Sequence, residues 1–116
     1  MRRMLVTKGW LVAFALVFSA GIANAQDAAA VKKGEQVYAA QKCSICHAIA
    51  GKGSKTNPLD GVGAKLSAAD TKQWITNPVE AAAKAKSTKK PPMPNKYGKL
   101  PAADVDALVA YMQSLK

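Results

Sequence analysis

Cys43-Ser44-Ile45-Cys46-His47 is the stretch around which the rest of this 116-residue chain can be interpreted. Two cysteines three positions apart can add their thiols to the two vinyl groups of a haem, and a histidine directly after them can bind the iron from one side. The spacing therefore predicts covalent attachment of a c-type haem through Cys43 and Cys46, with His47 as an axial ligand of the iron. The motif occurs once, which indicates one haem.

Three other uses of paired cysteines fit this chain less well. A structural zinc site needs four ligands, mostly Cys or His, whereas the chain has two cysteines and one histidine in total. A thioredoxin-like redox pair would follow a buried β-branched strand, and no such pattern precedes Cys43. A structural disulfide that spans two intervening residues would constrain almost nothing. Haem attachment is the interpretation that remains.

Residues 1–25 have the features of a secretory signal peptide. A positively charged start is followed by an uncharged apolar run over residues 10–18 and by small residues at 23–25, where a signal peptidase would cut. The apolar stretch is shorter than the about twenty residues that a membrane-spanning helix needs. We therefore expect cleavage after Ala25, a periplasmic location and no stable membrane insertion.

The remaining residues, 26–116, are predicted to form a single domain. A chain of this size buries little apolar surface and usually needs a disulfide, a metal or a large ligand to fold stably. A covalently attached haem would supply that apolar surface. The formal charge of the whole chain is +10, and removal of the signal segment, which carries three cations and no acid, leaves about +7.

From about Gly34 to the C-terminus, the chain resembles the small single-haem class I cytochromes c of bacteria. The haem motif carries this resemblance together with the segment Pro91-Pro92-Met93-Pro94. The resemblance implies an all-α fold, in which three to five short helices wrap around one covalently bound haem. The early position of the motif argues against the four-helix cytochromes, in which it lies near the C-terminus.

The pattern of apolar residues and caps predicts where the helices lie. Between the motif and the second helix, residues 48–63 are rich in Gly, Ser, Lys and Asn, so we expect an irregular loop there rather than helix or strand. The predicted helices cover residues 27–42, residues 67–76 with Ser67 as N-cap, one or two turns within residues 79–90, and residues 101–116 with Pro101 at the first helical position.

Gly34 within the first predicted helix costs about 1 kcal/mol relative to alanine, so it should have a structural reason. In the resembled family, a glycine and an aromatic residue of this helix let it cross closely over the last helix. Gly34 with either Val37 or Tyr38 matches that pattern, and Tyr111 matches an aromatic residue of the last helix.

The second axial ligand must be a methionine or a lysine, because the only histidine is already used. After residue 25 the methionines are Met93 and Met112. Met112 lies on the apolar stripe of the last predicted helix and is interpreted as a core residue. Met93 lies in a proline-rich segment that resembles the family's distal-ligand loop, where prolines restrict the backbone. We therefore expect Met93 to be the ligand.

The resemblance also implies a set of pocket residues around the haem. The carbonyl of Pro58 is expected to accept the second ring N–H of His47. Leu59 is expected to pack on the face of the haem, and Tyr97 to line the distal loop. Trp74 is either a core residue or, as in several relatives, a hydrogen-bond donor to a haem propionate.

These features predict a soluble periplasmic electron carrier that transfers one electron at a time and is not an enzyme. We expect a monomer that docks with redox proteins carrying acidic surfaces, because exposed lysines would surround the haem edge. The lysines expected there are Lys42, Lys52, Lys55, Lys96 and Lys99.

Two other functions remain open at this point. The chain could be the haem-bearing subunit of a multi-subunit oxidoreductase, or a haem sensor that binds a gas at a weak or absent sixth ligand. Nucleic-acid binding is not expected, because the chain is predicted to be exported and has no arginine after residue 25.

Overall fold

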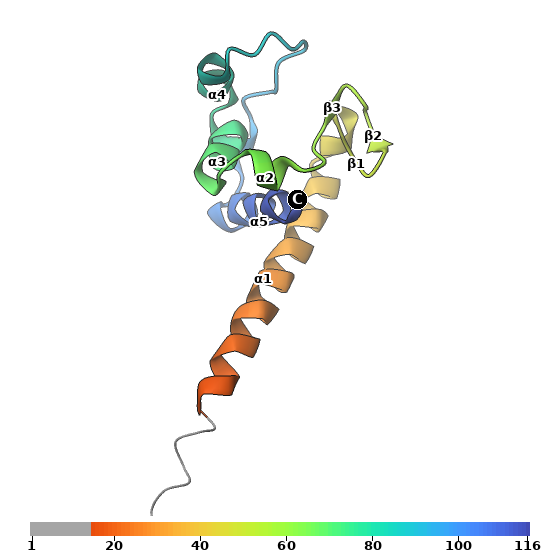
Figure 1. Ribbon diagram of the computed structural model, residues 1–116. Coiled ribbons are helices and arrows are strands. Elements are labelled where there is room, and N and C mark those ends of the chain that lie inside the picture. The colour runs from red at the N-terminus through yellow and green to blue at the C-terminus, as the bar shows by residue number, and fades with distance from the viewer. Residues whose placement is uncertain (1–14) are drawn as a thin grey trace, which may run out of the picture.

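The computed structural model describes the backbone of residues 15–116 and the side chains of residues 28–116. Within that range, the chain forms five α-helices and a small three-stranded sheet, which lies to one side of the helices near the C-terminal end of α1 (Figure 1). The helices are α1 (Ala15–Ala40), α2 (Val62–Lys65), α3 (Ala68–Thr76), α4 (Pro78–Ala85) and α5 (Ala102–Ser114). The strands are β1 (His47–Ile49), β2 (Lys52–Gly53) and β3 (Asn57–Pro58), and short 3-10 helices cover Cys43–Ile45 and Tyr97–Lys99. The predicted all-α class is confirmed, with the sheet as a minor addition.

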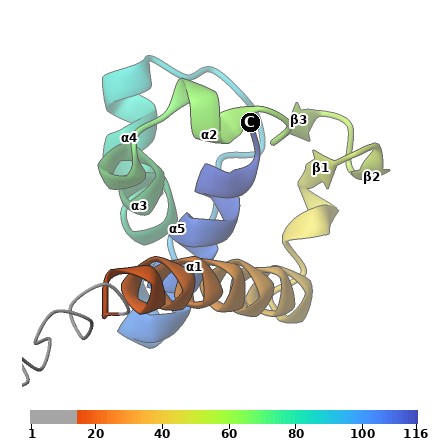
Figure 2. The same ribbon diagram turned by 60° about the horizontal axis from the view of Figure 1, so that its bottom comes forward.

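The crossing of α1 over α5 forms the base of the domain (Figure 2). A Cβ atom added at Gly34 would collide with the main-chain carbonyl of Ala107 and with the Cβ of Tyr111. One turn further along α1, the ring of Tyr38 meets the ring of Tyr111 edge to face, with 5.7 Å between centroids and an interplanar angle of 84°. The predicted role of Gly34 in a close helix crossing is confirmed, and of the two predicted partners on α1 it is Tyr38 that meets Tyr111.

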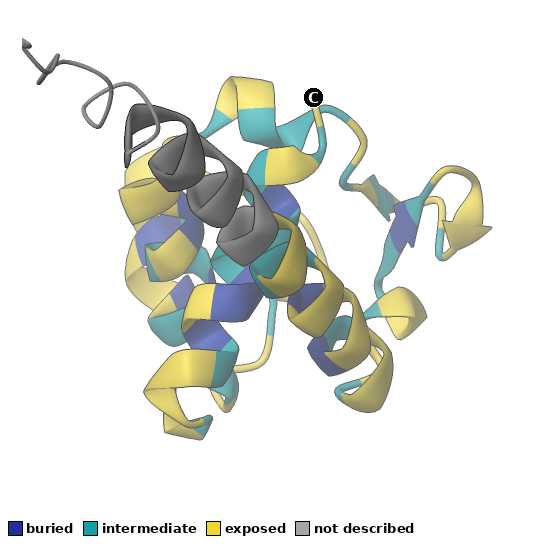
Figure 3. Ribbon diagram, turned by 90° about the horizontal axis from the view of Figure 1, so that it is seen from below, coloured by how far each residue is buried: buried dark blue, intermediate teal, exposed yellow. Residues whose placement is uncertain are grey.

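The hydrophobic core lies between α1, α3 and α5. Figure 3 shows the buried positions on the sides of the helices that face the interior. The apolar stripe predicted for the last helix is confirmed, because Val105, Leu108 and Met112 are all buried. The central cluster consists of Val37, Ile75, Val105 and Leu108.

Side-chain caps place α3 and α4 where the sequence predicts helices. The hydroxyl of Ser67 accepts a hydrogen bond from the backbone N–H of Asp70 at 3.1 Å, which satisfies one of the free donors at the start of α3. Asn77 ends α3, and its side chain accepts from the N–H of Glu80 to begin α4, with Pro78 as the first residue.

The prediction of an irregular loop over residues 48–63 is wrong. Strand β1 begins at the end of the haem motif and pairs antiparallel with β2 and parallel with β3 (Figure 1). Each strand has two or three residues, which is too short to give a recognisable alternation of apolar and polar side chains. The short helix α2 at the end of this region was also not predicted.

Several helix boundaries differ from the predicted ones. Helices α1 and α5 each end two residues earlier than predicted, at Ala40 and Ser114, and α4 begins at Pro78, one residue before the predicted range. Helix α1 begins at Ala15 rather than at residue 27, since the residues on both sides of that position are rich in alanine and contain no proline. Pro101 is the N-cap of α5 rather than its first helical residue.

Residues 1–14 of the predicted signal segment lie outside the described residues. Among the described helices, none combines the length and the apolar character needed to cross a membrane.

Candidate functional site

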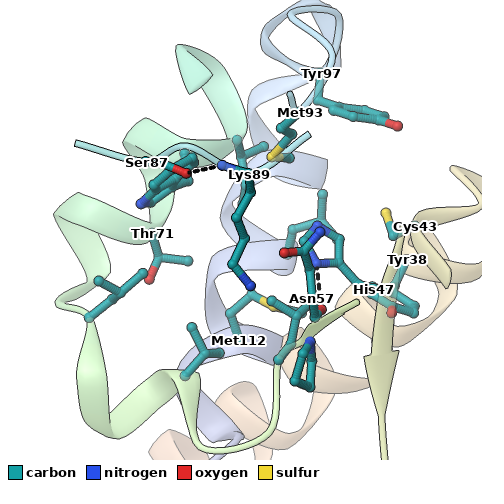
Figure 4. A pocket seen from close by; sticks show the side chains of 17 residues that line it. Tyr38, Cys43, His47, Asn57, Thr71, Ser87, Lys89, Met93, Tyr97 and Met112 are labelled. Carbon is teal, nitrogen blue, oxygen red and sulfur yellow. Dashed lines mark hydrogen bonds between the residues drawn. The ribbon is translucent and has the colours of Figure 1, made fainter. Parts of the chain in front are cut away.

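A cavity of about 280 Å³ opens between the haem motif, strand β3, helices α3 and α5, and the segment that precedes α5. Its lining is mainly apolar, and its residues come from distant parts of the sequence (Figure 4). Seven of the eight predicted site residues line this cavity: Cys43, His47, Pro58, Leu59, Trp74, Met93 and Tyr97.

The eighth predicted residue, Cys46, lines a smaller adjoining cavity of about 60 Å³. This second cavity is bordered on one side by the haem motif and on the other by the segment Pro91–Pro94. His47 and Met93 border both cavities. The fold therefore brings the motif and the proline segment together, although about fifty residues of sequence separate them.

The imidazole of His47 is oriented by a main-chain hydrogen bond. Its Nδ1 lies 3.0 Å from the carbonyl oxygen of Asn57, which leaves the other ring nitrogen available for a metal. The predicted acceptor, the carbonyl of Pro58, is wrong by one residue. The parallel pairing of β1 with β3 sets His47 opposite Asn57 and Ala48 opposite Pro58, so the register of the two strands decides the acceptor.

The loop after the motif is packed tightly against it. Gly53 has a φ of +107°, and a Cβ atom there would collide with the carbonyl oxygens of His47 and Ser44. The backbone N–H of Ser54 donates to the same Ser44 carbonyl at 3.0 Å. Because only glycine fits this close approach, the β1–β2 turn fixes the backbone of the motif.

The thiols of the motif are free and half-buried. Burial raises the pKa of the Cys43 thiol above its ordinary value, which keeps that thiol protonated at neutral pH. In the described part of the chain, no group of three or more His, Cys, Asp or Glu side chains comes together to hold a metal ion. The donor set of two thiols, one imidazole and thioethers in an apolar cavity instead fits a flat cofactor that carries its own iron.

Two methionines reach the main cavity. Met93 is half-buried on the segment above the cavity, and Figure 4 shows it on the side opposite the hydrogen bond that orients His47. Met112 is buried in α5 with 6% of its surface exposed, as expected for a core residue, and also contributes to the wall. Of the two, Met93 lies on the proline segment and also borders the second cavity.

Several other residues of the site were not identified as such from the sequence, among them Asn57, Tyr38 and Lys89. Asn57 supplies the acceptor for His47. Tyr38 lines the main cavity, and its hydroxyl is buried without a hydrogen-bond partner. Burial, reinforced by the nearby Cys43 thiol, raises the pKa of Tyr38 to about 12. The side chain of Lys89 also lines the cavity, and its ammonium donates to the carbonyl oxygen of Thr56 at 3.3 Å.

Comparison with protein families matches residues 31–116 to the family model described as Cytochrome c. Comparisons with curated proteins and with solved structures give no match. The matched range includes the motif, both cavities and the helices that surround them.

Proposed function

The chain belongs to the cytochrome c family, and from that premise we propose that it is a soluble periplasmic electron carrier of class I whose haem iron is bound by His47 and Met93. The family binds a covalently attached haem c, and the match supports haem-based electron transfer as the activity. When bound, this haem supplies an iron that changes between the ferric and ferrous states by one electron.

One observation carries the proposed ligation. The oriented imidazole of His47 and the thioether of Met93 border the same two cavities, between two segments that are distant in sequence. Cys43 and Cys46 would hold the porphyrin edge next to His47. If His47 and Met93 both bound the iron, the protein would leave it no open position for a substrate, which would suit a carrier better than an enzyme.

The residues around the two ligands support reversible electron transfer. The hydrogen bond from Nδ1 of His47 to Asn57 fixes the ring and raises its basicity as a ligand. A thioether ligand such as Met93 favours the ferrous state, and the apolar lining acts in the same direction because it disfavours the extra positive charge of the ferric state. We therefore propose a reduction potential that is raised by both effects.

We also propose where the mature protein is located and which class of partner it binds. We propose that residues 1–25 are a signal peptide cleaved after Ala25, and that the mature protein is a monomer that docks with acidic redox partners. The lysines that the sequence places around the haem motif and the distal segment support the choice of partner, because all five are exposed: Lys42, Lys52, Lys55, Lys96 and Lys99.

The absorption spectrum of the haem-loaded protein tests the ligation. The expected result is a low-spin spectrum with the weak long-wavelength band of a thioether–iron bond, and no binding of carbon monoxide by the reduced protein. Met93→Leu, which removes the sulfur at nearly constant volume, should lose the band and bind the gas. Met112→Leu is the matched control, and it should keep both properties of the unmutated protein.

Two outcomes would contradict the proposal. Loss of the band in Met112→Leu but not in Met93→Leu would assign the ligand to α5. Carbon monoxide binding by the unmutated reduced protein would mean an open sixth position, which fits a sensor rather than a carrier.

A further inference from the structure

We propose that Lys89 binds the haem as the cationic partner of one of its propionate groups. This inference rests on the haem site described above, but not on the identity of the sixth ligand. It gives a specific role to one residue of a lysine-rich segment that otherwise looks like a solvated surface.

The position of Lys89 beside the main cavity supports this role. The residue lies between the end of α4 and Met93, and its side chain extends along the main cavity (Figure 4). Its ammonium donates to the carbonyl oxygen of Thr56 at 3.3 Å, and Thr56 directly precedes Asn57 of the cavity lining. Its backbone N–H donates to the hydroxyl of Ser87 at 3.4 Å, which holds the start of the side chain at the edge of the cavity.

The charge of the residues that line the main cavity also supports this role. A haem carries two propionate carboxylates, and a carboxylate next to an apolar cavity needs a counter-charge or hydrogen-bond donors. Among the described residues, 28–116, none that lines the main cavity is acidic, and Lys89 is the one lysine or arginine in its lining. The ammonium therefore faces the cavity with a neutral carbonyl as its hydrogen-bond partner. A propionate would supply the missing negative charge.

The neighbouring lysines do not share this position. Lys84 is exposed on α4, where its ammonium donates to the side-chain carbonyl of Gln73 at 3.3 Å. Lys86 and Lys90 are exposed, as Lys89 is, but unlike Lys89 neither lines either cavity. Lys90 is thus a matched control, because it carries the same charge one residue away without contact with the cavity.

A cation held beside the haem should favour reduction, because the ferrous site carries one positive charge less than the ferric site. Lys89 is an exposed residue like Lys90, but a charge in direct contact with a propionate at the cavity is screened less by salt than a charge that makes no contact there. Removal of the Lys89 charge should therefore lower the midpoint potential more than removal of the Lys90 charge, and the difference should persist at high salt.

The test compares the haem-loaded variants Lys89→Gln, Lys90→Gln and Lys89→Arg with the unmutated protein. We expect Lys89→Gln to reduce the equilibrium constant for reduction by about threefold, which corresponds to about 28 mV for a one-electron couple. Lys90→Gln should change the equilibrium constant for reduction much less, and Lys89→Arg should keep most of the value of the unmutated protein. Equal shifts in the two glutamine variants would overturn the proposal.

A second measurement does not depend on redox behaviour. Acetylation of the haem-loaded protein, followed by mass spectrometry, should modify Lys89 more slowly than Lys90, because the ion pair protects its ammonium. Equal rates would overturn the role of Lys89. Failure of the ligation proposed above is a separate result, because it shows in the spectrum of the unmutated protein, whereas the Lys89 comparison needs only an attached haem.

Discussion

Replacement of Gly34 by alanine should destabilise the protein, although alanine is the better helix former by about 1 kcal/mol. The added Cβ would meet three atoms at less than ordinary contact distance: the carbonyl oxygen and carbon of Ala107 and the Cβ of Tyr111. None of the three is the far end of a flexible side chain, so α1 and α5 would have to move apart. That movement would loosen the core contacts between Val37 and Leu108.

The size of the effect follows from two opposing contributions. Overpacking of a well-packed interface costs about 1–3 kcal/mol, and two rigid main-chain atoms place this site at the upper end of that range. Subtraction of the about 1 kcal/mol gained in helix propensity leaves a net loss of about 2 kcal/mol. Denaturant titration of the haem-loaded protein, followed by far-ultraviolet circular dichroism, measures this loss directly.

An exposed position of the same helix provides the control. At Gln36, which faces solvent, the alanine variant should be more stable than the glycine variant by about 1 kcal/mol. The same glycine-to-alanine change is thus expected to lower the free energy of unfolding at position 34 and to raise it at position 36. If Gly34→Ala instead stabilises the protein as the exposed pair does, the close crossing of α1 over α5 is refuted.

Two further predictions concern the cavity and the surface. Tyr38→Phe should leave stability unchanged or slightly higher near neutral pH, because the hydroxyl is buried without a partner. Burial raises the pKa of Tyr38 from 10.0 to about 12. The protonated hydroxyl therefore contributes its full share to the free energy of unfolding below pH 10, and this share is lost as the pH rises to about 12. Denaturant titrations across this range should show a smaller alkaline loss in the phenylalanine variant, and equal losses would contradict the assignment. Stopped-flow rates of electron transfer to an acidic redox protein should fall as salt is added, whereas constant rates would exclude electrostatic steering.

Features that depend on short stretches of sequence could be predicted. The cap at Ser67, the helix break at Asn77 and the apolar stripe of α5 each depend on residues within a few positions of one another. Gly34 was predictable because a glycine inside a helix conflicts with local propensity and so indicates a contact. The haem motif, likewise, is contained in five consecutive residues.

Features that depend on non-local pairing could not be predicted. The strands are too short to carry a pattern, and the choice of Asn57 over Pro58 as the acceptor follows from the register between β1 and β3. Lys86, Lys89 and Lys90 lie in the same lysine-rich segment, so the sequence gives no reason to choose one of them. Only the path of the chain above the cavity distinguishes Lys89 from the other two.

The hydrogen bond that orients His47 ends on a main-chain oxygen, and this has a consequence for how the protein tolerates mutation. Any side chain at position 57 leaves that oxygen in place, so most point substitutions there should preserve the tilt of the imidazole. Insertion or deletion of a residue between the paired positions Ala48 and Pro58 would instead change which carbonyl lies opposite the ring. Apart from Gly53, where only glycine fits, the orientation of the imidazole therefore depends more on the length of this loop than on its composition.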